Sequence, residues 1–366
     1  MRIVVTGATG NIGTALLRRW ATSSEHHEVV GIARRPPEQP AQGVVTWVTA
    51  DLSREVSAPA LRTAFAGADA VVHLAWGFQP SHDLGYLEAL GVGGTRRVLD
   101  AVAANGVPHL VHMSSLGAYS PKHDDEPVDE SWPTDGVPSS PYSRHKVAAE
   151  RLLDAFEAAG PGAGTGAAPS GSSTVVTRLR PGIVGQRQAG SALLRYGIPG
   201  WLPARAVRLL PALPVDRGLV IPMVHADDVA AAIDLALEQG AGGAFNLAAD
   251  PPLTRDIIAD VLGARPLHVP SAIVRLAVSA SWHARVQQLD PGWIDLAFAL
   301  PLLDSTKARR ELGWEPTKDA VSVLREVVDG IADAASGPTP VLRPRSVADN
   351  LRRAVTEGPV FFRKRP

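Results

Sequence analysis

A glycine-rich turn near the start of the chain most constrains what the sequence can fold into. Residues 1–5 form a short apolar, β-branched run, and residues 6–14, with Gly7, Gly10 and Gly13, follow it. A helical pattern of apolar residues comes directly afterwards. This order of strand, turn and helix predicts a dinucleotide-binding turn. Gly7 would permit the tight turn, Gly10 would let amides approach a pyrophosphate, and Gly13 would let the helix pack close.

The composition sets limits on the class of protein. The 366 residues are 45% hydrophobic, carry a net charge of −1 and include no cysteine. The absence of cysteine excludes disulfides, thiolate nucleophiles and Cys-based metal sites. A near-neutral charge implies no general attraction to nucleic acid or membrane. The first strand starts at residue 2, and the sequence has no transmembrane-length apolar run. We therefore expect a cytoplasmic protein without a signal peptide.

The end of the second predicted strand, 29–33, bears on cofactor choice. An acid at this place would hydrogen-bond the ribose of NAD, but Arg34 and Arg35 stand there instead. Two guanidiniums suit a 2′-phosphate, which predicts NADP, with NAD as the alternative. The competing interpretation is a solvated pair of arginines before a proline-rich loop.

The next two predicted strands, 44–48 and 70–75, each end in residues of interest. Asp51 follows the first and could cap a helix. His73 lies in the second strand, and a structural role is favoured over a catalytic one.

Two further motifs carry chemistry. Ser114 and Ser115 follow a predicted strand at 109–113. Tyr142 and Lys146 are four residues apart, so on a helix they share one face. We expect the lysine ammonium to lower the pKa of the tyrosine, which would make the phenol an acid/base near neutrality.

These motifs in combination resemble the extended short-chain dehydrogenase/reductases, the NAD(P)-dependent epimerase/dehydratase family, from residue 2 to about 330. Trp76 and Gly91 depart from the family pattern, which usually has a small residue and an asparagine there. Leu116 and Gly117 lack the acids of the sugar-nucleotide 4,6-dehydratases, so that chemistry is disfavoured.

The resemblance implies roles for individual residues. Ser115 would hydrogen-bond the substrate oxygen, Tyr142 would exchange the hydroxyl proton, and Lys146 would tune Tyr142 and orient the ribose. The Asp51 carboxylate would accept a hydrogen bond from an adenine amine, and this interpretation and the helix cap both stay open. No metal site is expected. The cofactor-binding residues would be Gly7, Thr9, Gly10, Asn11, Ile12, Gly13, Arg34, Arg35, Asp51, Leu52, Leu74, Ala75, Tyr142, Lys146, Pro181 and Ile183.

The implied fold class is α/β, a doubly wound parallel sheet of Rossmann type with a smaller C-terminal α/β substrate lobe. Residues 1–180 would form the dinucleotide-binding domain and 181–336 the substrate lobe, partly interleaved with the sheet. Residues 337–366 would be a basic tail rich in proline and arginine.

Within the lobe we expect a substrate-side segment or packed loop at 197–214 and a strand at 245–248. Asp227 and Asp228 would be structural, with an acid capping a helix, and Val347, Leu351 and Val355 could dock part of the tail.

The predicted function is that of an NAD(P)-dependent oxidoreductase acting on a small molecule. The alternatives are a nucleoside-diphosphate-sugar epimerase that works through a transient ketone, and a catalytically silent NAD(P)-binding sensor. The Tyr142/Lys146 pair weighs against the sensor. A serine hydrolase is excluded because no Gly-x-Ser-x-Gly occurs. A zinc enzyme is disfavoured because His109 and His112 would point to opposite faces of a strand.

The resemblance also implies a homodimer that pairs through two helices. One helix is predicted near 86–105 and the other begins near Tyr142. The apolar residues offered to such an interface are Leu87, Leu90, Val98, Val102, Val147, Leu152 and Phe156. The same residues could instead face the sheet.

Overall fold

The computed structural model describes residues 1–24, 26–38, 46–160, 174–190, 208, 210–344 and 356. Its largest element is a parallel sheet of seven strands in the order β11-β7-β5-β4-β1-β2-β3. The strand order reverses beside β1, between its neighbours β2 and β4, which is where ligands bind in sheets of this kind. The strands are β1 (Arg2–Thr6), β2 (Glu28–Ala33), β3 (Thr46–Thr49), β4 (Ala70–His73), β5 (His109–Met113), β7 (Val175–Pro181) and β11 (Gly243–Leu247).

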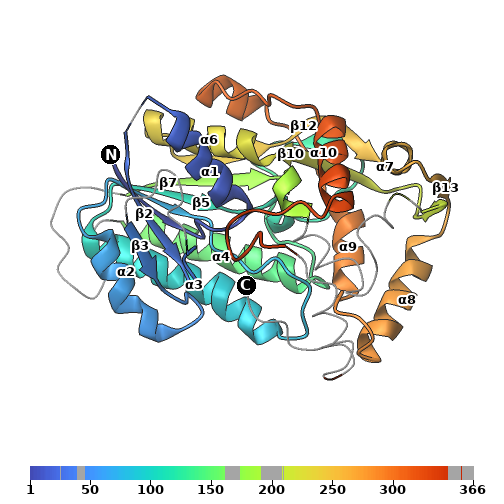
Figure 1. Cartoon of the computed structure of the whole chain (residues 1–366), viewed down its shortest axis with the longest axis horizontal. Coiled ribbons are helices and arrows are strands. Elements are labelled where there is room, and N and C mark those ends of the chain that lie inside the picture. The colour runs from blue at the N-terminus through green and yellow to red at the C-terminus, as the bar shows by residue number, and fades with distance from the viewer. Residues whose placement is uncertain are drawn as a thin grey trace.

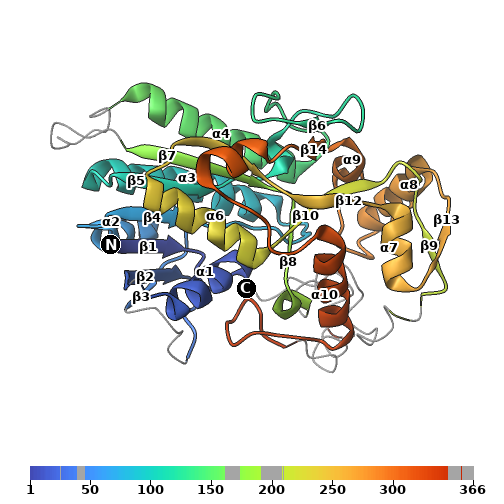
Figure 2. The same cartoon turned by 90° about the horizontal axis from the view of Figure 1, so that it is seen from above.

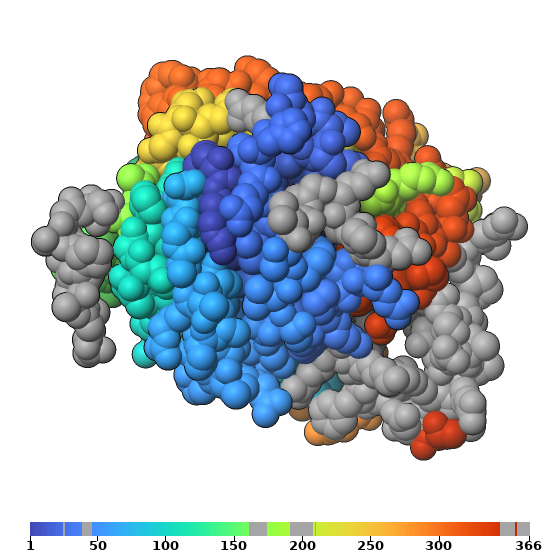
Figure 3. Space-filling model, turned by 60° about the vertical axis from the view of Figure 1, so that its left-hand side comes forward, coloured from blue at the N-terminus to red at the C-terminus, as the bar shows by residue number. Residues whose placement is uncertain are grey.

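Helices cover both faces of this sheet (Figures 1 and 2). One face packs against α1 (Asn11–Thr22) and α6 (Ala226–Gln239), and the other against α2 (Ala58–Phe65), α3 (Leu84–Asn105) and α4 (Pro141–Ala159). The strands β1, β2 and β4 read as nearly continuous apolar runs because both of their faces are buried. Figure 3 shows α6, in yellow, beside the blue N-terminal segment. The predicted α/β fold class, a doubly wound parallel sheet, is confirmed.

The smaller part of the molecule is built from later segments of the chain. A three-stranded sheet, β12-β10-β8, packs against α10 and α7. Its elements are β8 (Ile183–Gly185), β10 (Val220–His225), β12 (Ala249–Thr254), α7 (Arg255–Leu262) and α10 (Ala320–Ala332). Also present are α8 (Ser271–His283), α9 (Gly292–Ala299), and the strand pairs β6 (Pro127–Val128) with β14 (Leu302–Leu303) and β9 (Ala212–Pro214) with β13 (Arg265–Leu267).

The return of the chain to the large sheet corrects one expectation. Residues 245–247 were expected in a strand of the smaller lobe, but they belong to β11, which pairs with β7 in the large sheet. The prediction failed because α6 crosses back over the sheet, and a short apolar run does not reveal which sheet it joins.

Contacts of α6 fix this return. Trp20 and Arg19 on α1 both hydrogen-bond Asp234 on α6, at 2.9 and 2.7 Å. Asp228 accepts two hydrogen bonds from Thr317, and the Trp314 indole donates to its carbonyl at 2.8 Å. Asp228 is therefore structural, as expected, and the Asp227 carboxylate pairs with Arg18 on α1. The N-cap of α6 is His225 and not an acid, because its ring accepts from the Asp227 amide.

Other expectations fall partly outside the described residues. These are 44–45 of the third predicted strand, most of the segment 197–214, and Val347, Leu351 and Val355 of the tail.

Of the residues offered to a dimer interface, Val98, Val102 and Val147 are buried within the chain itself. Those three cannot contact a second copy, and the homodimer stays a prediction. Within the described part, no helix is long and apolar enough to cross a bilayer.

The close approach of α1 to β1 gives a stability prediction. A Cβ at Gly13 would lie 2.5 Å from the Gly7 carbonyl oxygen, and backbone cannot easily yield. We expect Gly13→Ala to lower the free energy of unfolding by roughly 1–3 kcal/mol. In Gly85→Ala, on α3, the new methyl meets nothing within 4 Å, so that control should gain up to about 1 kcal/mol from helix propensity. Urea unfolding of both variants checks this, and equal stability of Gly13→Ala and the unmodified protein would refute it.

Candidate active site at the sheet switch point

The glycine-rich turn brings β1, α1 and the segment after β4 into contact. Gly7 has a φ of +72°, and a Cβ there would lie 2.6 Å from the backbone nitrogen of Ala75. The Gly10 amide donates to the Gly7 carbonyl at 2.9 Å. Helix α1 then begins at Asn11 without a side-chain hydrogen bond at its N-cap. The first-turn amides of α1 are therefore available to an anion.

A cavity of about 420 Å³ runs from this turn to the carboxyl end of β5 and the start of α4. Ser115 lines it, and so does every predicted cofactor-binding residue except Arg35. Those residues are Gly7, Thr9, Gly10, Asn11, Ile12, Gly13, Arg34, Asp51, Leu52, Leu74, Ala75, Tyr142, Lys146, Pro181 and Ile183. The fold thus gathers residues that are far apart in the sequence around one space.

Positive charge gathers at the end of β2. The Arg34 guanidinium donates to the Tyr86 hydroxyl at 2.6 Å and lines the cavity. Arg35 lies outside the lining. Burial lowers the pKa of Arg35 from its ordinary value, and the nearby charges of Arg34 and Arg343 lower it further. Three guanidiniums therefore share this corner, and Arg343 comes from the C-terminal segment.

The structure excludes one of the two interpretations of Asp51, the helix cap. Its Oδ1 accepts from the backbone nitrogen and the hydroxyl of Ser53, at 3.0 and 2.7 Å. The helical segments that follow have N-caps at Arg54 and Ser57. Asp51 therefore caps no helix. It shapes a turn and lines the cavity, where it can meet an adenine.

Ser115, Tyr142 and Lys146 meet at the other end of the cavity. Ser115 ends the β5 segment, and its Oγ accepts from the Gly117 amide at 3.0 Å. Ser140 caps α4, which places Tyr142 in the first turn and Lys146 one turn later. The Lys146 ammonium donates to the Met113 carbonyl at 2.9 Å. A Cβ at Gly117 would lie 2.8 Å from the Tyr142 ring, so the glycine allows this close packing.

The electrostatics differ from the prediction. Burial raises the pKa of Tyr142 to about 12, although a hydrogen bond with Ser115 acts in the opposite direction. Burial lowers the pKa of Lys146 to about 7, against the opposite effect of Glu150. The prediction that Lys146 lowers the pKa of Tyr142 is wrong for this structure, because the amine faces Met113 and lies 3.6 Å from the Trp76 ring centroid. Tyr142 is therefore a neutral phenol near pH 7 and suits proton donation.

His73 is a structural residue here. Its ring nitrogens lie 2.6 and 3.2 Å from the hydroxyls of Thr6 and Thr95. Burial lowers the pKa of His73 to about 3, and the charge of Lys146 adds to this effect. The neutral imidazole has a hydrogen-bond partner at each ring nitrogen, and it links β1, β4 and α3.

A buried carboxylate supports the site from below. Glu150 lies one turn after Lys146 and accepts from Arg180 at 2.9 Å, Arg178 at 2.9 Å and Ser114 at 2.6 Å. Burial alone would raise the pKa of Glu150, but the bonds and charge of Arg180, with Ser114 and Arg178, hold it at about 2. Sequence reasoning missed this residue, although its spacing from Tyr142 and Lys146 puts all three on one helix face.

The C-terminal segment also reaches the site. The red trace after α10 turns back toward α1 (Figure 1). The Thr339 hydroxyl donates to the Thr9 carbonyl at 2.8 Å, and Val341 and Leu342 line the cavity. No sequence signal marked these residues. Among the residues that the structure describes, no cluster of histidine or acidic side chains could hold a metal ion.

Comparison with known proteins identifies the family. Residues 3–248 match the sequence model of the NAD dependent epimerase/dehydratase family. The chain belongs to this family. The match runs from the glycine-rich turn to the end of β11, so it covers the whole parallel sheet.

Curated relatives are distant. The chain is 28% identical over 333 residues to an uncharacterised protein of Mycobacterium tuberculosis, covering 89% of this chain but only 29% of that protein. It is 27% identical over 364 residues to the dTDP-glucose 4,6-dehydratase of Streptomyces antibioticus, covering 91% of this chain and 93% of the relative.

Solved structures share the fold. The UDP-glucose 4-epimerase of Thermus thermophilus, in complex with NAD, superposes with a TM-score of 0.65 at 24% identity over 91% of this chain and all of that one. The UDP-glucose 4-epimerase of Thermotoga maritima, with UDP-glucose, gives a TM-score of 0.68 at 20% identity, over 91% and 99% of the two chains. At this identity the likeness establishes the fold alone.

The Glu150 network yields a prediction about stability and its pH dependence. Glu150→Gln leaves two buried guanidiniums without their shared charge, so we expect a loss of about 3 kcal/mol or more at pH 7. Because the pKa of Glu150 falls from 4.5 to about 2, its contribution is complete above pH 4.5 and is lost as the pH falls through about 2. The difference in the free energy of unfolding between the variant and the unmodified protein should therefore become smaller in acid.

The control for this prediction is Asp154→Asn. Asp154 contacts the same Arg178 at 2.5 Å, but its side chain is 62% exposed. Exposed pairs contribute at most about 1 kcal/mol, so this variant should stay near the unmodified protein. Urea unfolding at pH 7 and pH 3 measures both variants. A Glu150→Gln protein as stable as Asp154→Asn would contradict the assigned role.

Proposed function

We propose that the chain is an NADP(H)-dependent oxidoreductase that moves a hydride between the nicotinamide and a carbonyl or hydroxyl carbon of a small molecule. The observation that carries this proposal is that Ser115, Tyr142 and Lys146 line the same cavity as the glycine-rich turn. A proton-transfer group and a dinucleotide cradle are both needed for this chemistry, and here one space holds both.

The residues of the cavity fit such a cofactor. Side chains at positions 7 and 13 would clash with neighbouring backbone, so the two glycines permit the tight turn that would hold a pyrophosphate beside the start of α1. Asp51 and Leu52 lie where the adenine would be held, and Arg34 lies where a 2′-phosphate would be met. Pro181 and Ile183 also line the cavity, and in this proposal they lie beside the nicotinamide.

The chain's own groups account for the proton. The bound cofactor supplies or accepts the hydride. Tyr142, neutral near pH 7, donates its hydroxyl proton to the substrate oxygen during reduction. Ser115 Oγ holds that same oxygen. Lys146 orients the ribose.

Epimerisation through a transient ketone is the second candidate. The family name and the structural likeness to UDP-glucose 4-epimerases favour it. The same three side chains would serve, with reduction following oxidation at one carbon. A silent sensor is disfavoured, because the fold brings the Tyr142/Lys146 pair to Ser115 at the cavity.

The domain division follows from the same proposal. Residues 1–180 would hold the cofactor, and 181–336 would close over the substrate, with α6 and β11 returning to the sheet. The tail from residue 337 would begin as part of the cofactor site, since Thr339 bonds the glycine-rich turn. A homodimer and a cytoplasmic location remain expectations from the sequence.

Replacing Tyr142 tests the proton role. Tyr142→Phe keeps the ring and removes only the hydroxyl, so turnover should fall by roughly 10²–10⁴-fold or more. Cofactor affinity should be nearly unchanged. Tyr119→Phe is the matched control, because its phenol bonds Asn246 at 2.6 Å outside the cavity lining. That variant should lose stability and keep turnover per folded molecule. More than a tenth of normal turnover in Tyr142→Phe would show that another group moves the proton.

Replacing Arg34 tests the cofactor choice. A charge-assisted hydrogen bond contributes about 1.5–3 kcal/mol, so Arg34→Ala should weaken NADPH binding by roughly tenfold or more. NADH binding should change little. Arg151→Ala removes an exposed arginine paired with Asp135 and should change neither affinity. Calorimetric titration of the unmodified protein and both variants with both cofactors gives six dissociation constants. Equal or tighter NADH binding, unaffected by Arg34→Ala, would overturn the NADP preference.

A further inference from the structure

The two departures from the family pattern, Trp76 and Gly91, touch one another. Trp76 follows β4 and lines the cavity. A Cβ at Gly91 would lie 2.9 Å from the Trp76 ring, which is closer than real Cβ contacts. The indole therefore occupies the space that a side chain at position 91 would need. The Lys146 ammonium lies 3.6 Å from the centroid of this ring. The presence of tryptophan at position 76 and glycine at position 91 therefore puts a large aromatic surface next to the proton-transfer residues.

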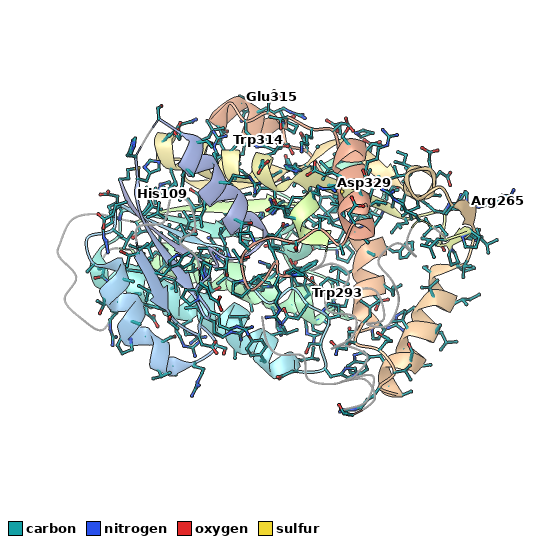
Figure 4. The ribbon with its side chains drawn as sticks, viewed as in Figure 1. His109, Arg265, Trp293, Trp314, Glu315 and Asp329 are labelled. Atoms are coloured by element: carbon teal, nitrogen blue, oxygen red, sulfur yellow. The ribbon has the colours of Figure 1, made fainter. Side chains whose placement is uncertain are left out.

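Three more aromatic rings extend this surface. Phe78 packs edge-on against Tyr142 at 5.4 Å between ring centroids and against Trp293 at 5.1 Å. Trp293 lies 5.1 Å from Tyr142, and Trp76 lies 6.5 Å from it. Figure 4 shows Trp293 on the side of α9 that faces the parallel sheet. Phe78 comes from the segment after β4, and Trp293 comes from α9. The two rings contact each other, and both contact the proposed proton donor Tyr142.

Most of the remaining lining on this side is apolar. Leu116, Leu296, Ala297 and Leu300 contribute aliphatic side chains, and Gln79, next to Phe78, contributes a neutral polar one. Among the described lining residues the cations are Arg34 and Lys146, and the proposed function assigns both to the cofactor. A nucleoside-diphosphate sugar brings a second pyrophosphate, which requires its own donors. The described substrate side offers aromatic and aliphatic carbon instead.

We infer that the substrate is an uncharged carbonyl compound, or the matching alcohol, that carries an aromatic ring beside the reacting carbon. Such a ring packs against Phe78 and Trp293 in edge-to-face or offset geometry while its oxygen meets Tyr142 and Ser115. This inference rests on the proposed function. In reduction, the carbonyl carbon gains a hydride from NADPH, the C=O electron pair moves to oxygen, and that oxygen takes the Tyr142 proton. The carbonyl is reduced and the cofactor is oxidised.

The test compares two substrate panels, each supplied with the form of the cofactor that its chemistry needs. One contains aryl ketones and aryl aldehydes with NADPH, and the other contains UDP-glucose, UDP-galactose and dTDP-glucose with NADP+ or NAD+. Turnover of the carbonyl panel is followed by nicotinamide absorbance, and conversion of the sugar nucleotides is followed by absorbance and by chromatography. We expect aryl carbonyl compounds to be reduced and sugar nucleotides to be left unchanged. Sugar-nucleotide conversion that Tyr142→Phe abolishes would overturn the inference and leave the proposed function standing. Cofactor binding without conversion in either panel would overturn both.

Variants of the aromatic surface make the test specific. Trp293→Leu should raise the KM for aryl substrates roughly tenfold and leave kcat and NADPH affinity nearly unchanged. Trp282→Leu is the matched control, because Trp282, on α8, lies outside the cavity lining. Its ring stacks on His82 with 4.5 Å between ring centroids. Phe78→Leu gives a second measurement if Trp293→Leu folds poorly, since Phe78 is 45% exposed. Unchanged KM in both Trp293→Leu and Phe78→Leu would contradict the assigned surface.

Discussion

The buried carboxylate of Glu150 is the constraint on which the site depends. A buried charge is stable only when it is paired and fully hydrogen-bonded. Glu150 satisfies this through Arg180 and Arg178 on β7 and Ser114 at the end of β5. These bonds fasten α4 to two adjacent strands. The same helix carries Tyr142 and Lys146, and Ser115 directly follows the serine that Glu150 holds.

The site therefore has two halves with different physical character. The half at the glycine-rich turn is made of backbone amides and arginine side chains, which suit phosphates. The half beyond Tyr142 is aromatic and aliphatic. Burial acts on the groups between them: it keeps Tyr142 protonated and brings the pKa of Lys146 to about 7. A proton donor thus stands at the boundary where a nicotinamide and a carbonyl would meet.

Local features of the sequence were enough to predict much of this arrangement. The roles of Gly7 and Gly13 could be predicted from the strand-turn-helix pattern, because the tight turn that requires them is a local feature of the sequence. Tyr142 and Lys146 are read from a spacing of four. The partners of Glu150 could not be predicted, because Arg178 and Arg180 lie on a strand that only the three-dimensional fold brings beside α4. The Trp76–Gly91 contact, the return of β11 to the large sheet and the Thr339–Thr9 bond are equally long-range. The pKa of Tyr142 was mispredicted because spacing does not reveal burial or the direction in which the Lys146 amine points.

Transfer of deuterium from the cofactor tests the central claim most directly. The protein would be incubated with NADPH carrying two deuterium atoms at nicotinamide C4 and with a carbonyl substrate found in the panels above. The account predicts a product alcohol with one deuterium on the carbon that bore the carbonyl oxygen, detected by mass spectrometry. Product formed without deuterium at that carbon would contradict hydride transfer as the reaction of this site.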